Sequence, residues 1–195
     1  MKKGNPLRLV LWPFLTTRAK LLANMIAPHV KQGEMGLDVG SGNMLVSKYV
    51  AQRQQAKIRG VDVLDMNLTS LSNTLFDGKT LPFRDKSFDF SLLIGVLHHV
   101  EKQQHLLDEA MRVTRKRIII FEDVYFNPLE KQWIKIRDIL GNIPEEPHMH
   151  FALNFHSEIE WERIFRQKGL TLVHKRTIFN PLRCTHHALY VLDKK

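Results

Sequence analysis

A carboxylate and two closely spaced glycines lie in the segment Leu37-Asp38-Val39-Gly40-Ser41-Gly42. A buried strand that ends in glycines and runs into a helix is typical of nucleotide binding. Glycine lets a ligand approach the backbone, and the first turn of the helix offers free N–H groups. A dinucleotide site would use G-x-G-x-x-G to hold a pyrophosphate. This chain has Leu45 at the third glycine position, which argues against that use.

Two carboxylates refine the kind of ligand expected. Asp38 directly precedes the first glycine, where its charge would repel a pyrophosphate and would attract an ammonium group. Asp62 ends the next predicted strand, where a carboxylate can accept hydrogen bonds from both hydroxyls of a ribose. The competing interpretation is that both are strand-end caps or turn residues. The pattern favours a ligand that carries a ribose and an ammonium group but no phosphate.

Four motifs follow one another along the chain. They are Leu-Asp-Val-Gly-Ser-Gly at 37–42, Gly-Val-Asp-Val at 60–63, Asp-Gly-x-x-Leu-Pro-Phe-x-Asp-x-Ser-Phe-Asp at 77–89 and Val-Leu-His-His-Val at 96–100. As an ordered set they resemble the class I methyltransferases that depend on S-adenosylmethionine (SAM), and most of all those that methylate small molecules, lipids and quinones. The resemblance covers about residues 30–125. It implies SAM as the cofactor.

The resemblance also implies a role for each matching position. The glycine segment would hold the methionine end of SAM, Asp62 the ribose, Val63 the adenine ring and Asp77 the adenine amino group. Asp77 also fits a turn. The chain departs from the family at Met44, where many members have a third glycine, and in the short 62–77 segment, where a loop can replace the usual helix. The full implied set is Asp38, Gly40, Ser41, Gly42, Asp62, Val63, Asp77, Gly78, Ile94 and Gly95.

Methyl transfer from a sulfonium needs no protein nucleophile. The protein must exclude water, align the acceptor and, for a weakly acidic acceptor, remove a proton. No catalytic residue is therefore assigned, and the candidates are His98, His99, His150 and Tyr125. The first two also fit a structural role at a helix start. His148 and His150 alternate like metal ligands, but no cysteine or carboxylate cluster completes a site, so no metal is expected.

The elements that position these residues predict an α/β fold. Apolar strands at 35–39, 58–63, 88–94 and 118–121 alternate with helices at 43–54 and 104–113, a pattern typical of a parallel sheet covered on both faces. The resemblance implies a Rossmann-like, doubly wound sheet of seven strands, mostly parallel, with the last strand antiparallel. The final strands, 170–177 and 188–192, are joined too closely for a helical crossover and should be antiparallel neighbours.

Length and composition fit one domain spanning residues 1–195. Residues 1–31 are predicted to form an N-terminal arm and a helix at 16–31 with Leu21, Leu22, Met25 and Ile26 on one face. Residues 126–156 are predicted to form a substrate lid insertion that begins with a helix at 128–140. Trp133, Phe151 and Phe155 in this insertion either contact a small or apolar acceptor or fill the core beneath it.

The bulk properties restrict the class of protein further. No apolar run is long enough for a membrane span. Cys184 is the single cysteine, which excludes an intrachain disulfide and agrees with a cytoplasmic location. The net charge of +9 suits a nucleic acid or a membrane surface, but the densest basic run, 112–117, falls at a helix C-terminus, where the helix dipole favours cations.

Several alternatives stay open. The partner is expected to be a small-molecule or lipid-like acceptor, ahead of nucleic acid, and the N-terminal arm can touch a membrane surface. A catalytically silent SAM-binding or partner-binding module and an RNA methyltransferase remain the competing functions. The sequence does not indicate the oligomeric state.

Overall fold

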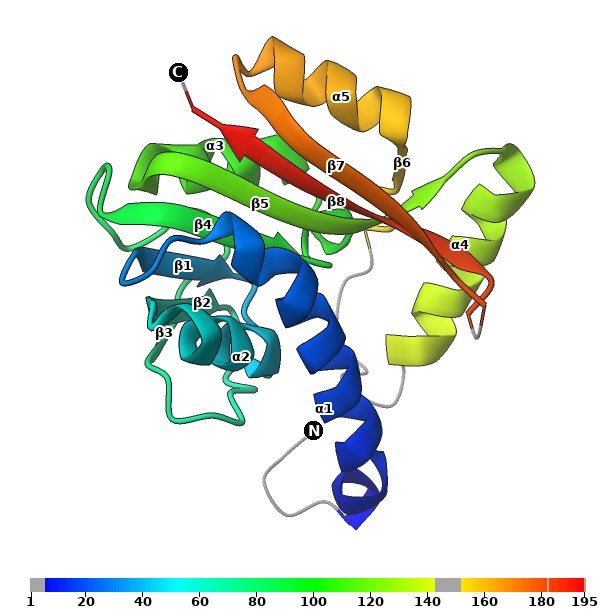
Figure 1. Cartoon of the computed structure of the whole chain (residues 1–195). Helices are drawn as coiled ribbons and strands as arrows, with labels where there is room; N and C mark the ends of the chain where they lie inside the picture. The colour runs from blue at the N-terminus through cyan, green and yellow to red at the C-terminus, as the bar shows by residue number, and fades with distance from the viewer. Residues whose placement is uncertain (1–5, 143–151, 182, 195) are drawn as a thin grey trace.

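A mixed eight-stranded sheet lies at the centre of the molecule in the computed structural model, which describes residues 6–142, 152–181 and 183–194 (Figure 1). The strand order is β3-β2-β1-β4-β5-β8-β7, and β6 pairs with β5. The strands are β1 Met35–Val39, β2 Lys57–Asp62, β3 Asn73–Leu75, β4 Phe88–Ile94, β5 Thr114–Tyr125, β6 His156–Ser157, β7 Thr171–Asn180 and β8 Thr185–Asp193. The helices are α1 Pro6–Ile26, α2 Leu45–Gln54, α3 Gln103–Val113, α4 Pro128–Asn142 and α5 Glu158–Gln167, with 3-10 turns η1 Ala27–His29 and η2 Leu97–His99.

The strand directions confirm the predicted fold class. Strands β3, β2, β1, β4 and β5 are parallel, whereas β8 is antiparallel to both β5 and β7. The last strand is therefore the antiparallel one, inserted between β5 and β7, and the two final strands are antiparallel neighbours. The sequence predicted seven strands. The eighth is β6, which has only two residues and therefore leaves no periodic pattern to recognise.

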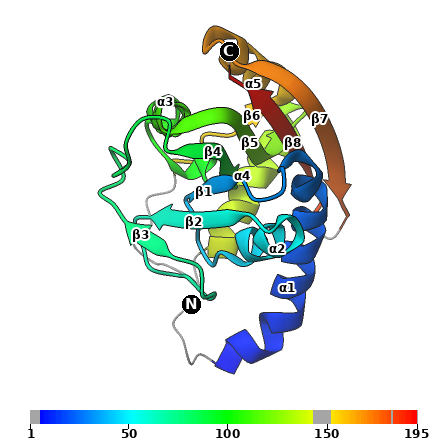
Figure 2. The same ribbon diagram turned by 60° about the vertical axis from the view of Figure 1, so that its left-hand side comes forward.

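Helices cover both faces of the sheet (Figure 2). Successive strand side chains point to opposite faces, so Leu93 and Ile120 pack with α3 and α5 while Leu92 and Ile119 pack with α1 and α2. Each face buries its own hydrophobic cluster, which explains why the strands are apolar throughout. This packing fixes the carboxyl ends of β1, β2, β4 and β5 along one edge, where the glycine turn lies.

The first helix and the strand β5 differ most from their predicted bounds. Helix α1 spans Pro6–Ile26. It begins ten residues before the predicted 16–31 helix and ends five residues before it does. Its early end has a local cause, because Pro28 has no backbone N–H to continue the α-helical hydrogen bonds, and the chain passes into the 3-10 turn η1. The predicted inner face was partly wrong, because Leu21 is 59% exposed whereas Leu22 and Ile26 are buried.

Strand β5 is much longer than the predicted 118–121. It gains its length by pairing with β8 over residues 117–124, a long-range contact that no local pattern reveals. The predicted loop is confirmed, because residues 63–72 join β2 to β3 without a helix. Ser157 and Glu160 form a capping box at the start of α5. Within the described residues, none of the helices is both long and apolar enough to span a membrane.

Candidate functional site

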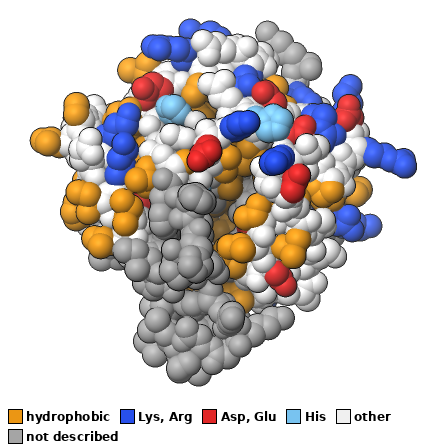
Figure 3. All heavy atoms as spheres, turned by 180° about the vertical axis from the view of Figure 1, so that it is seen from behind, with side chains coloured by type: hydrophobic (Ala, Val, Ile, Leu, Met, Phe, Trp, Pro, Cys, Tyr) orange, Lys and Arg blue, Asp and Glu red, His pale blue; other side chains and the backbone are white. Residues whose placement is uncertain are grey.

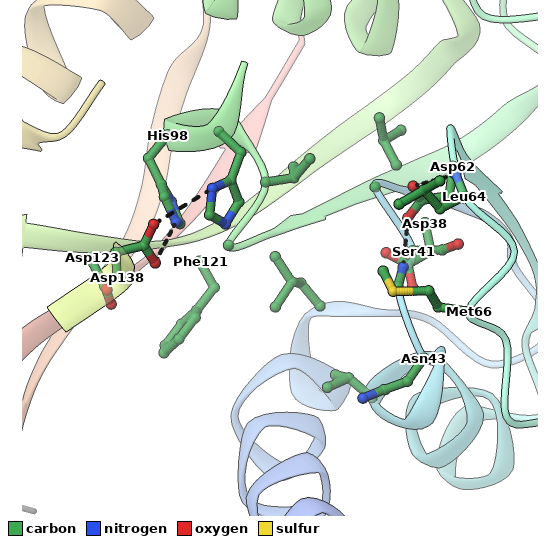
Figure 4. Close-up of a pocket in the computed structure, with 18 of the residues that line it drawn as sticks. Asp38, Ser41, Asn43, Asp62, Leu64, Met66, His98, Phe121, Asp123 and Asp138 are labelled. Carbon is green, nitrogen blue, oxygen red and sulfur yellow. Dashed lines mark hydrogen bonds and ion pairs between the residues drawn. The ribbon is translucent and has the colours of Figure 1, made fainter. Parts of the chain in front are cut away.

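A cavity of about 950 Å³ opens at the carboxyl ends of β1, β2, β4 and β5. Figure 4 shows Asp38, Ser41 and Asp62 on one side of it and His98, Asp123 and Asp138 on the other. We call these the glycine-turn half and the charged half. Phe14, Leu15 and Arg18 of α1 also line the cavity. The N-terminal helix is therefore part of the site, which the sequence had not indicated.

The glycine turn depends on close backbone packing. Gly40 has φ +66°, and a Cβ added there would lie 2.1 Å from a methyl carbon of Val96. No other residue type fits without displacing the turn after β4. The Gly40 N–H donates to the Val61 carbonyl at 2.9 Å, which ties the turn to β2. Gly42 and Met44 also have positive φ, and α2 begins directly afterwards at Leu45.

Asp38 is buried beneath this turn with 3% of its surface exposed. The Ser47 hydroxyl donates to its Oδ2 at 2.6 Å. Burial raises the pKa of Asp38 to about 7; the bond from Ser47 opposes this shift, and the nearby charge of Asp62 adds to it. A buried carboxylate that is only half ionised near neutral pH is suited to a cationic ligand, because the cation would favour the ionised form.

The carboxylate of Asp62 accepts hydrogen bonds from two nearby backbone N–H groups. The Gly42 N–H donates to Asp62 Oδ2 at 2.8 Å, and the Leu64 N–H donates to Oδ1 at 3.2 Å. A carboxylate has about four acceptor positions, so each oxygen retains capacity toward the cavity that Asp62 lines. The two interpretations left open by the sequence are therefore compatible, since the backbone bonds fix the carboxylate that faces the cavity.

The far end of the glycine-turn half is mostly apolar. Val63, Leu64, Met66, Phe76 and Gly78 line it. Asp77 is not among the lining residues. Its Oδ1 accepts hydrogen bonds from the backbone N–H groups of the two residues at 79 and 80, which lower the Asp77 pKa. The structure thus places Asp77 at the rim as a turn cap.

Glu122 organises the turn between the two halves, where Ile94 and Gly95 line the cavity. It is 1% exposed, and its Oε1 accepts hydrogen bonds from the N–H groups of Val96 and Leu97 at 3.0 and 2.8 Å. The strand predicted at 118–121 stops just before Glu122, but this residue lies within β5. A buried strand residue thus holds the first turn after β4 in place.

His98 is positioned as a cation. Its Nδ1 lies 2.5 Å from Glu122 Oε2. Burial alone would lower the pKa of His98, but the negative charge of Glu122 and the polar contacts with Asp138 and Glu122 outweigh it and raise the pKa to about 10. A histidine that is already protonated at neutral pH cannot take a proton from the acceptor. The raised pKa argues against His98 as a general base, and its contact with Glu122 favours a structural role.

His99 has the opposite electrostatic character. It lines the cavity, and burial together with the charge of His98 lowers its pKa, so its imidazole is neutral. Of the four candidate bases, it alone is both neutral and shown to face the cavity among the described residues. Tyr125 does not line the cavity; its hydroxyl donates to Glu160 at 2.7 Å. His150 lies outside the described residues, as do His148 and Phe151.

The predicted lid insertion contributes α4 to the charged half. Its Trp133 and Leu140 line the cavity, and Ile134, 1% exposed, packs into the core. Phe155 is buried and stacks on His98 with 4.6 Å between ring centroids, so it supports the site from behind. Seen from behind, hydrophobic side chains gather on the side where α4 lies (Figure 3). Leu129 of α4 is 83% exposed.

Four charged or polar residues of this half were missed from the sequence: Arg137, Asp138, Arg183 and His187. Asp123 pairs with both Arg137 and His187. Burial opposes ionisation of Asp123, but these partners lower its pKa to about 2. Arg183 comes from the β7–β8 connection, and within the described parts of the chain its guanidinium has no hydrogen bond or ion pair. No local motif could have revealed contacts between such distant elements.

Comparison with known families identifies the class. Residues 37–121 match the family model of a methyltransferase domain, and all four ordered motifs fall within the match. Together with the fold, this match confirms the resemblance to the class I methyltransferases. The match covers less than half of the chain, and it includes the glycine segment and Asp62.

Two curated relatives are each 28% identical to the chain. One is the bifunctional methionine biosynthesis protein MetXA/MetW of Rhodopirellula baltica, matched over 67% of this chain and 17% of the relative. The other is a tRNA (carboxymethyluridine(34)-5-O)-methyltransferase of Saccharomyces cerevisiae, matched over 48% of this chain and 41% of the relative. The chain spans less than half the length of either relative.

Solved structures share the fold at low sequence identity. A putative methyltransferase in complex with the Haloferax volcanii Trm112 activator superimposes with a TM-score of 0.72 and 16% identity, covering 93% of this chain and 92% of that chain. The Burkholderia thailandensis 1,6-didemethyltoxoflavin-N1-methyltransferase, solved with its substrate and S-adenosylhomocysteine, gives 0.70 and 16%, covering 91% and 78%. These likenesses extend the shared fold to nearly the whole chain.

Proposed function

We propose that the chain transfers the methyl group of SAM to an acceptor held in the charged half of the cavity. One observation carries this proposal: a single cavity joins a glycine turn with two buried carboxylates to a second, chemically different set of side chains. A methyl donor and its acceptor must share one chamber, because an in-line displacement needs the reacting atoms in contact. The matched methyltransferase domain supports the same reaction.

The donor set fits SAM in the glycine-turn half. Asp38, buried with a raised pKa, faces the place of a cationic methionine end, beside Gly40, Ser41 and Gly42. Asp62 presents its remaining acceptor positions to the ribose hydroxyls. The apolar residues Val63, Leu64, Met66 and Phe76 suit adenine, with Asp77 and Gly78 at the rim. Ile94 and Gly95 would border the methionine end. When bound, SAM supplies the activated methyl group.

The residues of this chain then have three tasks: to orient the acceptor, to exclude water and to receive a proton if the acceptor loses one. Phe14 and Leu15 of α1 and Trp133 of α4 give the cavity apolar walls. Neutral His99 is the group suited to accept a proton. His98, held by Glu122, keeps the turn that carries His99 in place.

The charged half favours a small acceptor with a negatively charged group. The guanidinium of Arg183 is without an ion pair within the described parts of the chain, and Arg137 lies in the same half. An arginine matches carboxylate or phosphate geometry with two parallel hydrogen bonds. This revises the apolar acceptor expected from Trp133, Phe151 and Phe155. The yeast relative is named for a tRNA acceptor, which keeps RNA as the second candidate.

The test begins with calorimetry of SAM and S-adenosylhomocysteine on the wild type and on Asp62→Ala. The proposal predicts binding of both ligands by the wild type and a large loss in the variant. Methyl transfer from labelled SAM is then measured against pools of small carboxylates and phosphates, neutral small molecules, lipids and RNA. Absence of binding would overturn the proposal. Binding without transfer to any pool would indicate a silent SAM-binding module.

A further inference from the structure

We propose that His98, His99 and Asp138 form a binding site for one divalent transition-metal ion in the charged half of the cavity. One ligand atom from each residue lies within 4.8 Å of the others. Two of the residues are adjacent in η2, and the third comes from α4 (Figure 4). This inference does not depend on the proposed methyl transfer, and it revises the expectation from the sequence that the chain has no metal site.

The spacing between the ligand atoms fits an ion between them. His98 Nε2 lies 3.7 Å from Asp138 Oδ1, and His99 Nδ1 lies 3.6 Å from Asp138 Oδ2. Both separations are too long for good hydrogen bonds. Two ligands that are each about 2.1 Å from a tetrahedral metal lie about 3.4 Å apart. The three side chains would need only small movements to bind one ion, and binding would displace the proton that His98 carries on Nε2 in the free protein.

The surroundings of His98 resemble the support that metal-binding histidines receive. Its Nδ1 lies 2.5 Å from the buried carboxylate of Glu122, which leaves Nε2 directed toward Asp138. Histidines that bind metals commonly donate their other ring N–H to a carboxylate, which fixes the ring and its tautomer. Phe155 stacks against the same ring and restricts it further. The cluster is thus oriented by its neighbours before any ion arrives.

The donor set indicates the class of ion. Two imidazole nitrogens and one carboxylate oxygen suit zinc, iron(II), cobalt(II), nickel(II) or manganese(II) better than magnesium or calcium, which prefer oxygen alone. Three protein ligands leave at least one coordination position open, and all three residues line the cavity. With an ion bound, His99 would act as a ligand and not as the proton acceptor, and the open position would face the place proposed for the acceptor. The competing explanation is a network of ion pairs with no affinity for metal.

The experiment uses the full chain without a polyhistidine tag, after treatment with a chelator. Cobalt(II) is titrated while ligand-field absorption is recorded, and zinc then competes for the site. We expect one equivalent to bind to the wild type, with affinity reduced at least about tenfold in Asp138→Asn and in His99→Ala. His105→Ala is the matched control, because His105 is an exposed histidine outside the cluster, bonded to the Lys79 carbonyl.

A second measurement guards against misfolded variants. Zinc should raise the midpoint of thermal unfolding of the wild type and of His105→Ala, but not that of Asp138→Asn, which conserves the side-chain size. Absence of cobalt and zinc binding up to millimolar metal would overturn the inference. So would equal affinity in the wild type, Asp138→Asn and His99→Ala. SAM calorimetry on the same samples keeps the result separate from the proposed function, since either can fail without the other.

Discussion

The two halves of the cavity are built by different means. In the glycine-turn half, backbone N–H groups and the carboxylates Asp38 and Asp62 sit at the ends of two neighbouring parallel strands. In the charged half, paired side chains converge from η2, β5, α4 and the β7–β8 connection. The first arrangement is rigid because it follows from the sheet itself. The second depends on many separate side-chain contacts, so its residues can change to suit a different acceptor without disturbing the sheet.

The largest expected effect tests the rigidity of the glycine-turn half. Gly40→Ala should lower the free energy of unfolding by about 3 kcal/mol, because the new Cβ would collide with Val96 and the backbone has positive φ. The matched control is Gly33→Ala, which also has positive φ but has no neighbouring atom within 4 Å of the added Cβ. That variant should lose about 1 kcal/mol. Urea unfolding measures both, and equal losses would show that packing at Gly40 contributes nothing.

Asp62→Ala should produce the largest loss in cofactor binding. It removes the acceptor for the ribose hydroxyls and for the Gly42 and Leu64 N–H groups. Loss of charged hydrogen bonds predicts roughly a hundredfold higher Kd for SAM, measured by calorimetry. Asp77→Ala is the comparison, since its carboxylate caps an exposed turn. A similar loss in both variants would mean that Asp77 contacts the ligand directly despite its position at the rim.

These two halves also differ in how far the sequence predicts them. Gly40, Asp38 and Asp62 could be identified because each lies at the end of a short apolar strand, where local pattern and function coincide. Arg137, Arg183 and His187 could not, because their association depends on the β5–β8 pairing and on the position of α4. The same reason explains the misjudged length of β5 and the unexpected contribution of α1. Local sequence patterns therefore predict individual strands and turns well, but they do not predict contacts between residues far apart in the chain.

The pH dependence of cofactor binding should come from the glycine-turn half. Asp38 has a pKa raised to about 7, so it is mostly protonated at pH 6 and mostly ionised at pH 8. If the ionised form binds the cation, SAM affinity should rise about tenfold across that range. Asp38→Asn should lack this rise. Calorimetry at several pH values on both proteins checks it, and an equal rise in the variant would assign the titration elsewhere.

The stability of the ligand-free protein should fall as the pH rises, whereas its affinity for SAM should increase. A folded-state pKa above the unfolded value means that the protonated carboxyl fits its buried site better than the charged one. The contribution of Asp38 to stability is then fully present below pH 4 and is lost as pH rises through about 7. Comparing urea midpoints of the wild type and Asp38→Asn at pH 5 and pH 8 isolates this contribution, because the asparagine does not titrate.

The smallest effect concerns the boundary between the halves. Trp133 lines the cavity from α4, and its indole N–H donates to the Arg183 carbonyl at 3.1 Å. Trp133→Ala should therefore disturb the wall beside Arg183 and lower kcat/KM for the acceptor about tenfold, through a lost contact of about 1.4 kcal/mol. The Kd for SAM should change less than about threefold, since a shift below 1 kcal/mol reflects no direct contact. If calorimetry instead shows SAM affinity falling as much as kcat/KM, then α4 closes over both ligands, and the two halves act as one binding site.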